Sequence, residues 1–193
     1  MMFQFLIEFV KHPKAVGAIM PSGRALAEKM MEPIQFERAR CIVEYGPGTG
    51  SFTRKLVKYK KEGTKLFLIE NNPVFYKKLR KEFGMLKGVY IIHGSAENVN
   101  RYLLEYGVRG VDYIVSGLPF TSLPKDVSEK ILLAAQSVIG AKGKFITFQY
   151  SLVKRRFFEK YFTLAGCLLE LKNLPPAYVL VMKQKGKVVS SDL

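Results

Sequence analysis

The residues Glu44-Tyr45-Gly46-Pro47-Gly48-Thr49-Gly50-Ser51 form a glycine-rich stretch between two segments of different pattern. The apolar run Cys41–Tyr45 precedes it, and an amphipathic segment at residues 52–61 follows it. Short continuous apolar runs are typical of strands that are buried on both faces, whereas amphipathic segments of this length are typical of helices. A glycine turn between a strand and a helix lets the backbone approach a ligand closely. The stretch therefore predicts a ligand-binding turn at the start of an α/β sheet.

The same alternation continues along the chain and predicts a doubly covered sheet. We expect strands at residues 41–45, 65–69, 89–92, 111–116 and 144–148, and helices at residues 22–31, 52–61, 73–83, 96–106, 124–139 and 157–162. Two further strands, at residues 165–171 and 178–183, are joined by a tight connection that contains Pro175 and Pro176, which predicts an antiparallel pair at one edge. The expected fold is Rossmann-like: a mostly parallel seven-stranded sheet with an antiparallel edge hairpin and helices on both faces.

The length of 193 residues predicts one domain, with an N-terminal helical cap at residues 1–36 and a sheet core at residues 37–184. Ser22 is the expected N-cap of the cap helix. The 48% content of hydrophobic residues excludes a disordered chain. Two cysteines fit a reducing cytosol, and the spacing of His and Cys predicts no metal site. No apolar run reaches the roughly 20 residues that span a bilayer, and the apolar residues 1–10 lack the features of a signal peptide.

The net charge of +15, from 31 Lys and Arg against 16 Asp and Glu, predicts an anionic partner. Nucleic acid and an anionic membrane surface both fit this charge, and charge alone does not choose between them. Solubility alone is the remaining explanation.

The spacing of the glycines separates three kinds of nucleotide site. Because position 51 is Ser, the stretch misses the dinucleotide pattern G-x-G-x-x-G, and it lacks the Gly-Lys-Ser/Thr ending of a P-loop. An acidic residue, Glu44, two positions before the first of three alternating glycines fits an S-adenosylmethionine loop, in which the carboxylate meets the cationic amino group directly or through water. Glu70 ends the second strand twenty residues after Gly50. A carboxylate there can accept both ribose hydroxyls; the alternative is a plain turn with a solvated Glu70.

Two later strand ends complete the predicted site. Ser95 or Glu97, after the third strand, can bond the adenine amino group, although a Glu in a first helical turn also compensates the helix dipole. Ser116 and the following residues 117–120, Gly-Leu-Pro-Phe, come after the fourth strand, where ligands bind in open α/β sheets. There the backbone carbonyls and the ring of Phe120 would lie beside the transferred methyl group. The alternative is a Gly-Pro turn with Phe120 in the core.

On these residues the chain resembles the class I S-adenosylmethionine-dependent methyltransferases over nearly its whole length. It is similar to the rRNA adenine dimethyltransferases, which share the loop form V-E-x-G-P-G-T-G and carry Asn-Leu/Ile-Pro-Tyr/Phe after the fourth strand. It is also similar to the bacterial phospholipid N-methyltransferases, which tend to carry Gly-Leu-Pro there. In this chain Gly117 replaces the Asn whose amide oxygen helps to free the lone pair of the adenine amino group. The C-terminal RNA-binding domain of the dimethyltransferases is not expected either, because the predicted sheet ends by Lys183.

Further stretches resemble the lipid enzymes. Residues 12–22 are similar to their segment that closes over the cofactor, which implies roles for Pro21 and Ser22, and residues 173–177 are similar to their late hairpin. Tyr150 lies where those enzymes carry a Tyr near the acceptor; a strand-end aromatic is the alternative. The implied cofactor-binding set is Pro21, Ser22, Glu44, Gly46, Gly48, Gly50, Glu70, Asn71, Ser95, Ala96, Glu97 and Ser116, and the implied catalytic set is Gly117, Leu118, Pro119, Phe120 and Tyr150.

The resemblance implies methyl transfer from S-adenosylmethionine, with S-adenosylhomocysteine as product, to the amine of an aminophospholipid such as phosphatidylethanolamine or to an ornithine lipid. An RNA adenine N6-methyltransferase and a non-catalytic membrane- or RNA-binding module on the same fold are the alternatives. The expected location is cytoplasmic and peripheral on the inner face of the membrane. Residues 1–10 would either insert into that membrane or pack on the domain.

Overall fold

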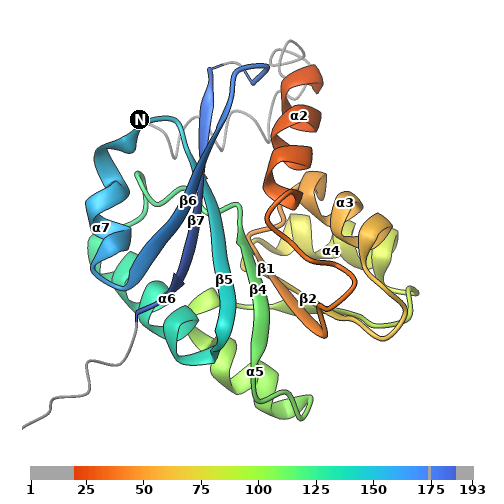
Figure 1. Cartoon of the computed structure of the whole chain (residues 1–193). Helices are drawn as coiled ribbons and strands as arrows, with labels where there is room; N and C mark the ends of the chain where they lie inside the picture. The colour runs from red at the N-terminus through yellow and green to blue at the C-terminus, as the bar shows by residue number, and fades with distance from the viewer. Residues whose placement is uncertain (1–19, 174, 186–193) are drawn as a thin grey trace, which may run out of the picture.

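The computed structural model describes residues 20–173 and 175–185, which form a seven-stranded sheet between two layers of helices (Figure 1). The strands are β1 Cys41–Tyr45, β2 Lys65–Glu70, β3 Val89–His93, β4 Val111–Ser116, β5 Ile139–Gln149, β6 Phe162–Glu170 and β7 Ala177–Gln184. The helices are α2 Met20–Met31, α3 Ser51–Tyr59, α4 Pro73–Phe83, α5 Val99–Glu105, α6 Lys125–Val138 and α7 Arg155–Glu159, with short 3₁₀ turns η2 Ala96–Asn98 and η3 Leu152–Lys154.

The strand order is β3-β2-β1-β4-β5-β7-β6. The first five strands in this order are parallel to one another, while β7 runs antiparallel to both β5 and β6. The order reverses between β1 and β4, so the carboxyl ends of these two strands flank the point where ligands bind in open α/β sheets. The predicted mostly parallel sheet with an antiparallel edge hairpin is confirmed.

Each face of the sheet has its own hydrophobic core. One core joins the sheet to α5, α6 and α7 and contains Phe120, Phe145, Phe158 and Phe162, all at most 1% exposed. The other joins the sheet to α2, α3 and α4. Strands β1 and β2 are buried on both faces, whereas β6, apart from its two buried ends, alternates between partly buried and exposed positions, as an edge strand with one solvated face does. Because helices cover both faces of the sheet, the backbone can reach a ligand at the ends of the strands.

Several predicted boundaries were wrong. Helix α2 begins at Met20, so Ser22 lies inside its first turn and is not its N-cap. The helix expected at residues 157–162 ends at Glu159, and Phe162 instead begins β6, where its ring stacks on Phe145 with centroids 5.3 Å apart. Core packing of this ring therefore overrides the helical pattern. The helix expected at residues 96–106 is divided into η2 and α5.

Proline and cap placement follow local physical chemistry. Pro73 occupies the first turn of α4, at the start of the helix expected at residues 73–83, and the side chain of Asn72 caps that helix by accepting the N–H of Val74 at 2.9 Å. Pro124, where the expected helix at residues 124–139 begins, is instead the cap residue of α6. Within residues 20–173 and 175–185, no helix has the length and apolar character to cross a membrane, and no cluster of His, Cys, Asp or Glu has the form of a metal site.

Candidate functional site

Backbone hydrogen bonds hold the carboxyl ends of β1, β2 and β4 together. The N–H of Gly46, just after β1, donates to the carbonyl of Ile69 in β2 at 3.0 Å. The N–H of Gly117, just after β4, donates to the carbonyl of Tyr45 at 2.9 Å. The glycine loop and the segment after β4, which the sequence placed at one site, are therefore adjacent.

The glycine loop, residues 46–50, turns by means of left-handed backbone at all three glycines, with φ of 62°, 55° and 84° at Gly46, Gly48 and Gly50. Gly46 and Gly50 are also sites of close packing: an added Cβ would lie 2.6 Å from Leu118 and 3.2 Å from Phe83, respectively. At Gly48 an added Cβ would have only the carbonyl of Gly46 within 4 Å, at 3.9 Å. The middle glycine therefore has free space on the side where a side chain would lie, as close approach of a ligand to the backbone requires.

Glu70 links the glycine loop to the turn after β2. Its Oε2 accepts the N–H of Gly48 at 2.9 Å, and its Oε1 accepts the N–H of Asn72 at 2.8 Å. The side chain is only 6% exposed. Because each carboxylate oxygen has two lone pairs, both oxygens keep capacity for a further donor such as a ribose hydroxyl. Glu70 is thus a structural brace of the loop as well as a candidate ligand for a sugar.

Glu44 is buried beneath the loop. It is 0% exposed, and its Oε2 accepts the hydroxyl of Thr53 in α3 at 2.7 Å, while Oε1 has no partner. Burial raises the pKa of the Glu44 carboxyl to about 8, against the lowering effect of the Thr53 hydroxyl; the charge of Glu70 raises it further. The unpartnered oxygen is the kind of group that a cationic ligand would stabilise. The sequence did not predict that the carboxyl is fully enclosed.

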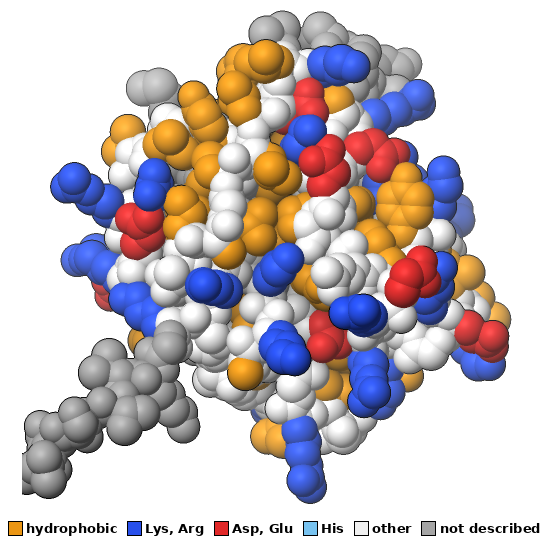
Figure 2. All heavy atoms as spheres, viewed as in Figure 1, with side chains coloured by type: hydrophobic (Ala, Val, Ile, Leu, Met, Phe, Trp, Pro, Cys, Tyr) orange, Lys and Arg blue, Asp and Glu red, His pale blue; other side chains and the backbone are white. Residues whose placement is uncertain are grey.

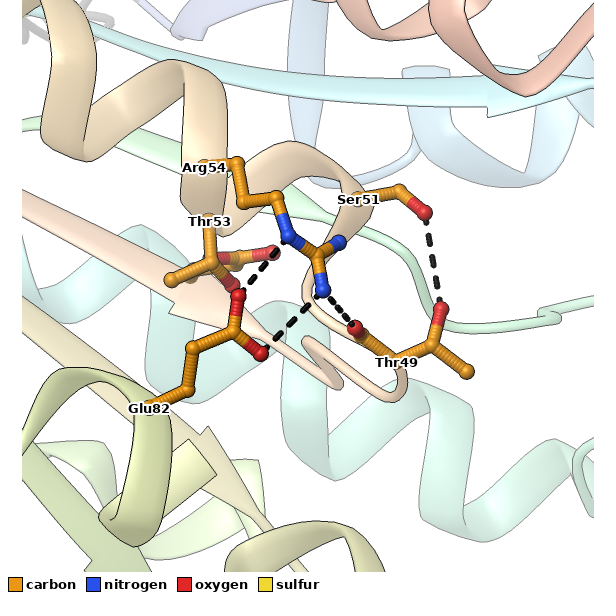
Figure 3. Close-up of polar contacts among 6 residues, drawn as sticks. Thr49, Ser51, Thr53, Arg54 and Glu82 are labelled. Atoms are coloured by element: carbon orange, nitrogen blue, oxygen red, sulfur yellow. Dashed lines mark hydrogen bonds and ion pairs between the residues drawn. The ribbon is translucent and has the colours of Figure 1, made fainter. Parts of the chain in front are cut away.

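An arginine clamp, which the sequence did not reveal, fixes the loop from outside. Figure 3 shows Arg54 reaching from α3 between Glu82 and Thr49. Its Nε and Nη2 donate to the two carboxylate oxygens of Glu82 at 2.8 and 3.1 Å, and Nη2 also donates to the carbonyl of Thr49 at 3.2 Å. The clamp connects the loop to the last turn of α4. Arg54 is 48% exposed, so its energetic contribution is modest and its main effect is positional.

The residues predicted to bond the adenine amino group lie in the turn after β3. Ser95 caps η2, and its hydroxyl donates to Glu97 Oε1 at 3.2 Å, while Ala96 is buried. Asn71 is exposed beside this turn, and its carbonyl lies 3.2 Å from His93 Nε2. These residues follow neighbouring strands, since Glu70 pairs with His93. The structure thus brings the predicted adenine-side residues next to Glu70.

The segment after β4 is tightly packed against the glycine loop. An added Cβ at Gly117 would lie 2.9 Å from the carbonyl oxygen of Gly46, so this backbone leaves no room for a side chain without movement of the loop. Ser116 is buried and accepts the N–H of Leu118 at 3.3 Å, and Pro119 is partly buried. Phe120 lies in the core, 5.1 Å from the Phe158 ring, as in the core alternative. Its ring therefore does not line the strand ends in this conformation.

An aromatic row, defined as Phe52, Phe148 and Tyr150, extends from the segment after β4 toward the end of β5. Phe52 in α3 lies beside Gly117, since an added Cβ there would be 3.7 Å from its ring. Phe52 and Phe148 meet edge to face at 5.8 Å, and Phe148 and Tyr150 do so at 5.5 Å. Burial raises the pKa of the Tyr150 hydroxyl, and a hydrogen bond with Asn173 lowers it. The sequence pointed to Tyr150 but not to the two phenylalanines.

The segment at residues 12–22, which resembles the closing segment of the lipid enzymes, has little structural description. Pro21 and Ser22 lie in the first turn of α2, but their side chains, and all of residues 12–19, lie outside the described residues.

Two shallow hollows, of about 440 and 580 Å³, open on the described surface. Glu97 is among the residues that line the first, and the second lies between α2 and α3. Neither hollow contains a residue of the glycine loop.

The donors and acceptors at these strand ends fit S-adenosylmethionine. The free space at the side-chain position of Gly48 suits close approach of the methionine part, and the spare lone pairs of Glu70 suit the ribose hydroxyls. The unpartnered oxygen of Glu44 suits the positive charge of the amino group. The turn at residues 95–97 offers hydrogen-bonding groups on the side where the adenine would lie.

Comparison with known proteins agrees with this assignment. Residues 23–161 match the family described as ribosomal RNA adenine dimethylase. Over 177 residues the chain is 30% identical to a protein of Singulisphaera acidiphila named ornithine lipid N-methyltransferase, a match that covers 91% of this chain and 92% of that relative.

Solved structures show the same fold at low identity. The 1,6-didemethyltoxoflavin-N1-methyltransferase of Burkholderia thailandensis, solved with bound 1,6-didemethyltoxoflavin and S-adenosylhomocysteine, matches with a TM-score of 0.70 and 10% identity, covering 95% of this chain and 86% of that one. The N-methyltransferase NodS of Bradyrhizobium japonicum matches with a TM-score of 0.66 and 11% identity, covering 86% of this chain and 98% of that one.

Proposed function

Because the chain belongs to the class I S-adenosylmethionine-dependent methyltransferases, in the family described as ribosomal RNA adenine dimethylase, we propose that it transfers the methyl group to the amine of an amino lipid. The relative named ornithine lipid N-methyltransferase supports this acceptor class. Phosphatidylethanolamine, its partly methylated forms and ornithine lipids all carry an amine of this kind. The proposed place of action is the inner face of the cytoplasmic membrane.

The observation that carries the proposal is the packing of Gly117. Adenine methylation in the enzymes that this chain resembles relies on an Asn amide at this position. Here an added Cβ would lie 2.9 Å from the backbone oxygen of Gly46, and Gly117 has no side-chain amide. An alkylamine has a lone pair that is not conjugated with a ring, so it does not need that amide. The packing at Gly117 therefore favours an alkylamine over adenine.

The chain's residues would act mainly by positioning. S-adenosylmethionine, when bound, supplies an activated methyl group on a sulfonium. Alignment of acceptor and donor can contribute roughly 7–11 kcal/mol to lowering a barrier of this type. The backbone carbonyls at residues 117–118 and the hydroxyl of Tyr150 are the acceptors that could orient the amine. No dedicated general base is assigned.

The aromatic row would increase the fraction of the acceptor amine that is neutral and able to attack. An alkylamine with a pKa near that of Lys is neutral in only about 10⁻³ to 10⁻⁴ of molecules at pH 7. Desolvation against Phe52, Phe148 and Tyr150 would lower that pKa and raise the neutral fraction. The same ring faces can attract the methylated ammonium product by cation–π interaction.

The test offers labelled S-adenosylmethionine to the enzyme in parallel with vesicles that contain phosphatidylethanolamine or ornithine lipid, vesicles without an amino lipid, and total RNA. We expect label in the lipid fraction of the amino-lipid vesicles only. A variant with Tyr150→Ala should lose most of this transfer while binding the cofactor normally. Label in RNA adenine, or none in lipid, would refute the lipid assignment.

RNA adenine is the second candidate acceptor. The family match and the net charge of +15 favour it. The RNA arm of the same experiment decides between the two acceptors.

A further inference from the structure

Exposed hydrophobic side chains are concentrated at one end of the sheet. Eleven large hydrophobic residues of the described chain are exposed, and five of them lie in two short segments at the carboxyl end of β5 and the turn between β6 and β7. These five are Tyr150, Leu152, Val153, Leu169 and Leu171, and Val153 and Leu171 are 85% and 71% exposed. The other six are distributed over α4, α5, α6 and the turns beside them. We call Leu152, Val153, Leu169 and Leu171 the edge patch.

Strand pairing brings the two segments of the edge patch to the same end of the sheet. Gln149, at the end of β5, pairs with Tyr178 in β7, and Tyr178 pairs with Leu169 in β6. The residues that follow Gln149 and those that follow Leu169 therefore leave the same end of the sheet, on either side of the start of β7. Figure 2 shows hydrophobic side chains gathered over the β6–β7 hairpin, with Lys and Arg side chains along the neighbouring border over α7.

Residues 150–172 are positively charged. They contain five basic residues, Lys154, Arg155, Arg156, Lys160 and Lys172, against two acidic residues, Glu159 and Glu170, a net charge of +3. Both acids are engaged locally: Glu159 pairs with Arg155 at 2.9 Å, and Glu170, 8% exposed, accepts the N–H of Lys172 at 2.7 Å. The outward surface around the edge patch is therefore basic.

We propose that the edge patch and its basic border dock on an anionic lipid bilayer, an inference that rests on the proposed lipid-methylating function and assigns the surface it uses. Aliphatic side chains enter the interface between headgroups and acyl chains, and Lys and Arg are attracted to anionic headgroups. Tyr150 lies two residues before Leu152 of the edge patch, and its ring contacts Phe148 at the end of the aromatic row. A lipid amine in the docked bilayer would thus face the row that leads to Gly117.

This assignment differs from docking through residues 1–10, which the sequence suggested. It is also specific to a bilayer, since exposed Leu and Val have no favourable partner on the phosphate backbone of RNA, whereas lipid buries them.

The test measures sedimentation of the full chain with vesicles of phosphatidylcholine alone and with vesicles that also contain phosphatidylglycerol, without cofactor or amino lipid. We expect the wild type to bind the anionic vesicles preferentially. Val153→Asp and Leu171→Asp should each weaken that binding about tenfold or more. Met85→Asp and Leu104→Asp are matched controls, because these side chains are 96% and 69% exposed at positions away from the edge patch and the charge change is the same.

Equal effects in the two pairs of variants would overturn the proposal, as would a wild type that ignores anionic vesicles. Unchanged binding in Val153→Asp and Leu171→Asp, with loss after removal of residues 1–10, would assign docking to those residues instead. Because the vesicles contain no methyl acceptor, the result does not depend on catalysis. Binding to vesicles through the edge patch without any methylation of lipid would contradict the proposed function but would still support the proposed docking surface.

Discussion

Replacement of Gly48 by Ala separates the strain of the glycine loop from its role in binding. At Gly48 φ is 55°, and an added Cβ would have only one atom within 4 Å, at 3.9 Å, so the cost is backbone strain without a clash. A left-handed conformation costs a non-glycine residue about 1–2 kcal/mol. Each kcal/mol lowers the Tm of a chain of this size by about 2–4 °C. The N–H that donates to Glu70 is retained.

Gly107 provides a matched control. Its φ is 66°, nothing lies within 4 Å of an added Cβ, and it follows α5, far from the glycine loop in the sequence. Gly48→Ala and Gly107→Ala should therefore lower the Tm by similar amounts. Calorimetric titration with S-adenosylhomocysteine should give an affinity at least about tenfold lower for Gly48→Ala, a difference of roughly 1.4 kcal/mol, and a wild-type affinity for Gly107→Ala. Equal affinities in the two variants would refute the assignment of the loop as the cofactor cradle.

Three further substitutions test other parts of the site. Glu70→Gln should cost about 1–3 kcal/mol of stability, because the amide cannot accept the N–H groups of both Gly48 and Asn72, and should weaken cofactor binding; urea unfolding and titration measure both, and normal binding would argue against a sugar contact. The Glu44 carboxyl, whose pKa burial raises to about 8, favours its protonated form in the folded chain, so its contribution to stability is complete below about pH 4.5 and is lost as the pH rises toward 8. The free energy of unfolding of the wild type, measured with urea, should therefore fall between pH 5 and pH 8 by about 3–5 kcal/mol more than that of Glu44→Gln. An equal fall in the variant would show that another group titrates. Gly117→Asn should lose about 1–3 kcal/mol of stability by pushing on the glycine loop, and adenine methylation by that variant would contradict the packing argument.

The glycine loop and Glu70 could be predicted because their roles depend on local order. A strand, a turn of alternating glycines and a helix follow one another within a few residues, and Glu70 ends the next strand. Parallel pairing of β1 with β2 then brings the two together with no further information. The segment at residues 116–120 was placed by the same logic.

The remaining parts of the site depend on packing between distant elements. Phe52 and Phe148 are 96 residues apart, and each looks like an ordinary core residue in its own segment. The Arg54–Glu82 pair is one of many Lys, Arg and Glu combinations on exposed helical faces, and sequence spacing does not select it. The complete burial of Glu44 follows from the packing of Thr53 over the end of β1, which the glycine pattern does not encode. Phe162 joined β6 for a similar reason, because its ring stacks on Phe145 across the sheet.

A crystal structure of the complex with S-adenosylhomocysteine tests the site most directly. The account predicts the ribose hydroxyls within hydrogen-bonding distance of the Glu70 carboxylate and the amino-acid part against the backbone at Gly48. A nucleoside bound at another edge of the sheet, or a Glu70 that makes no contact with the sugar, would contradict it.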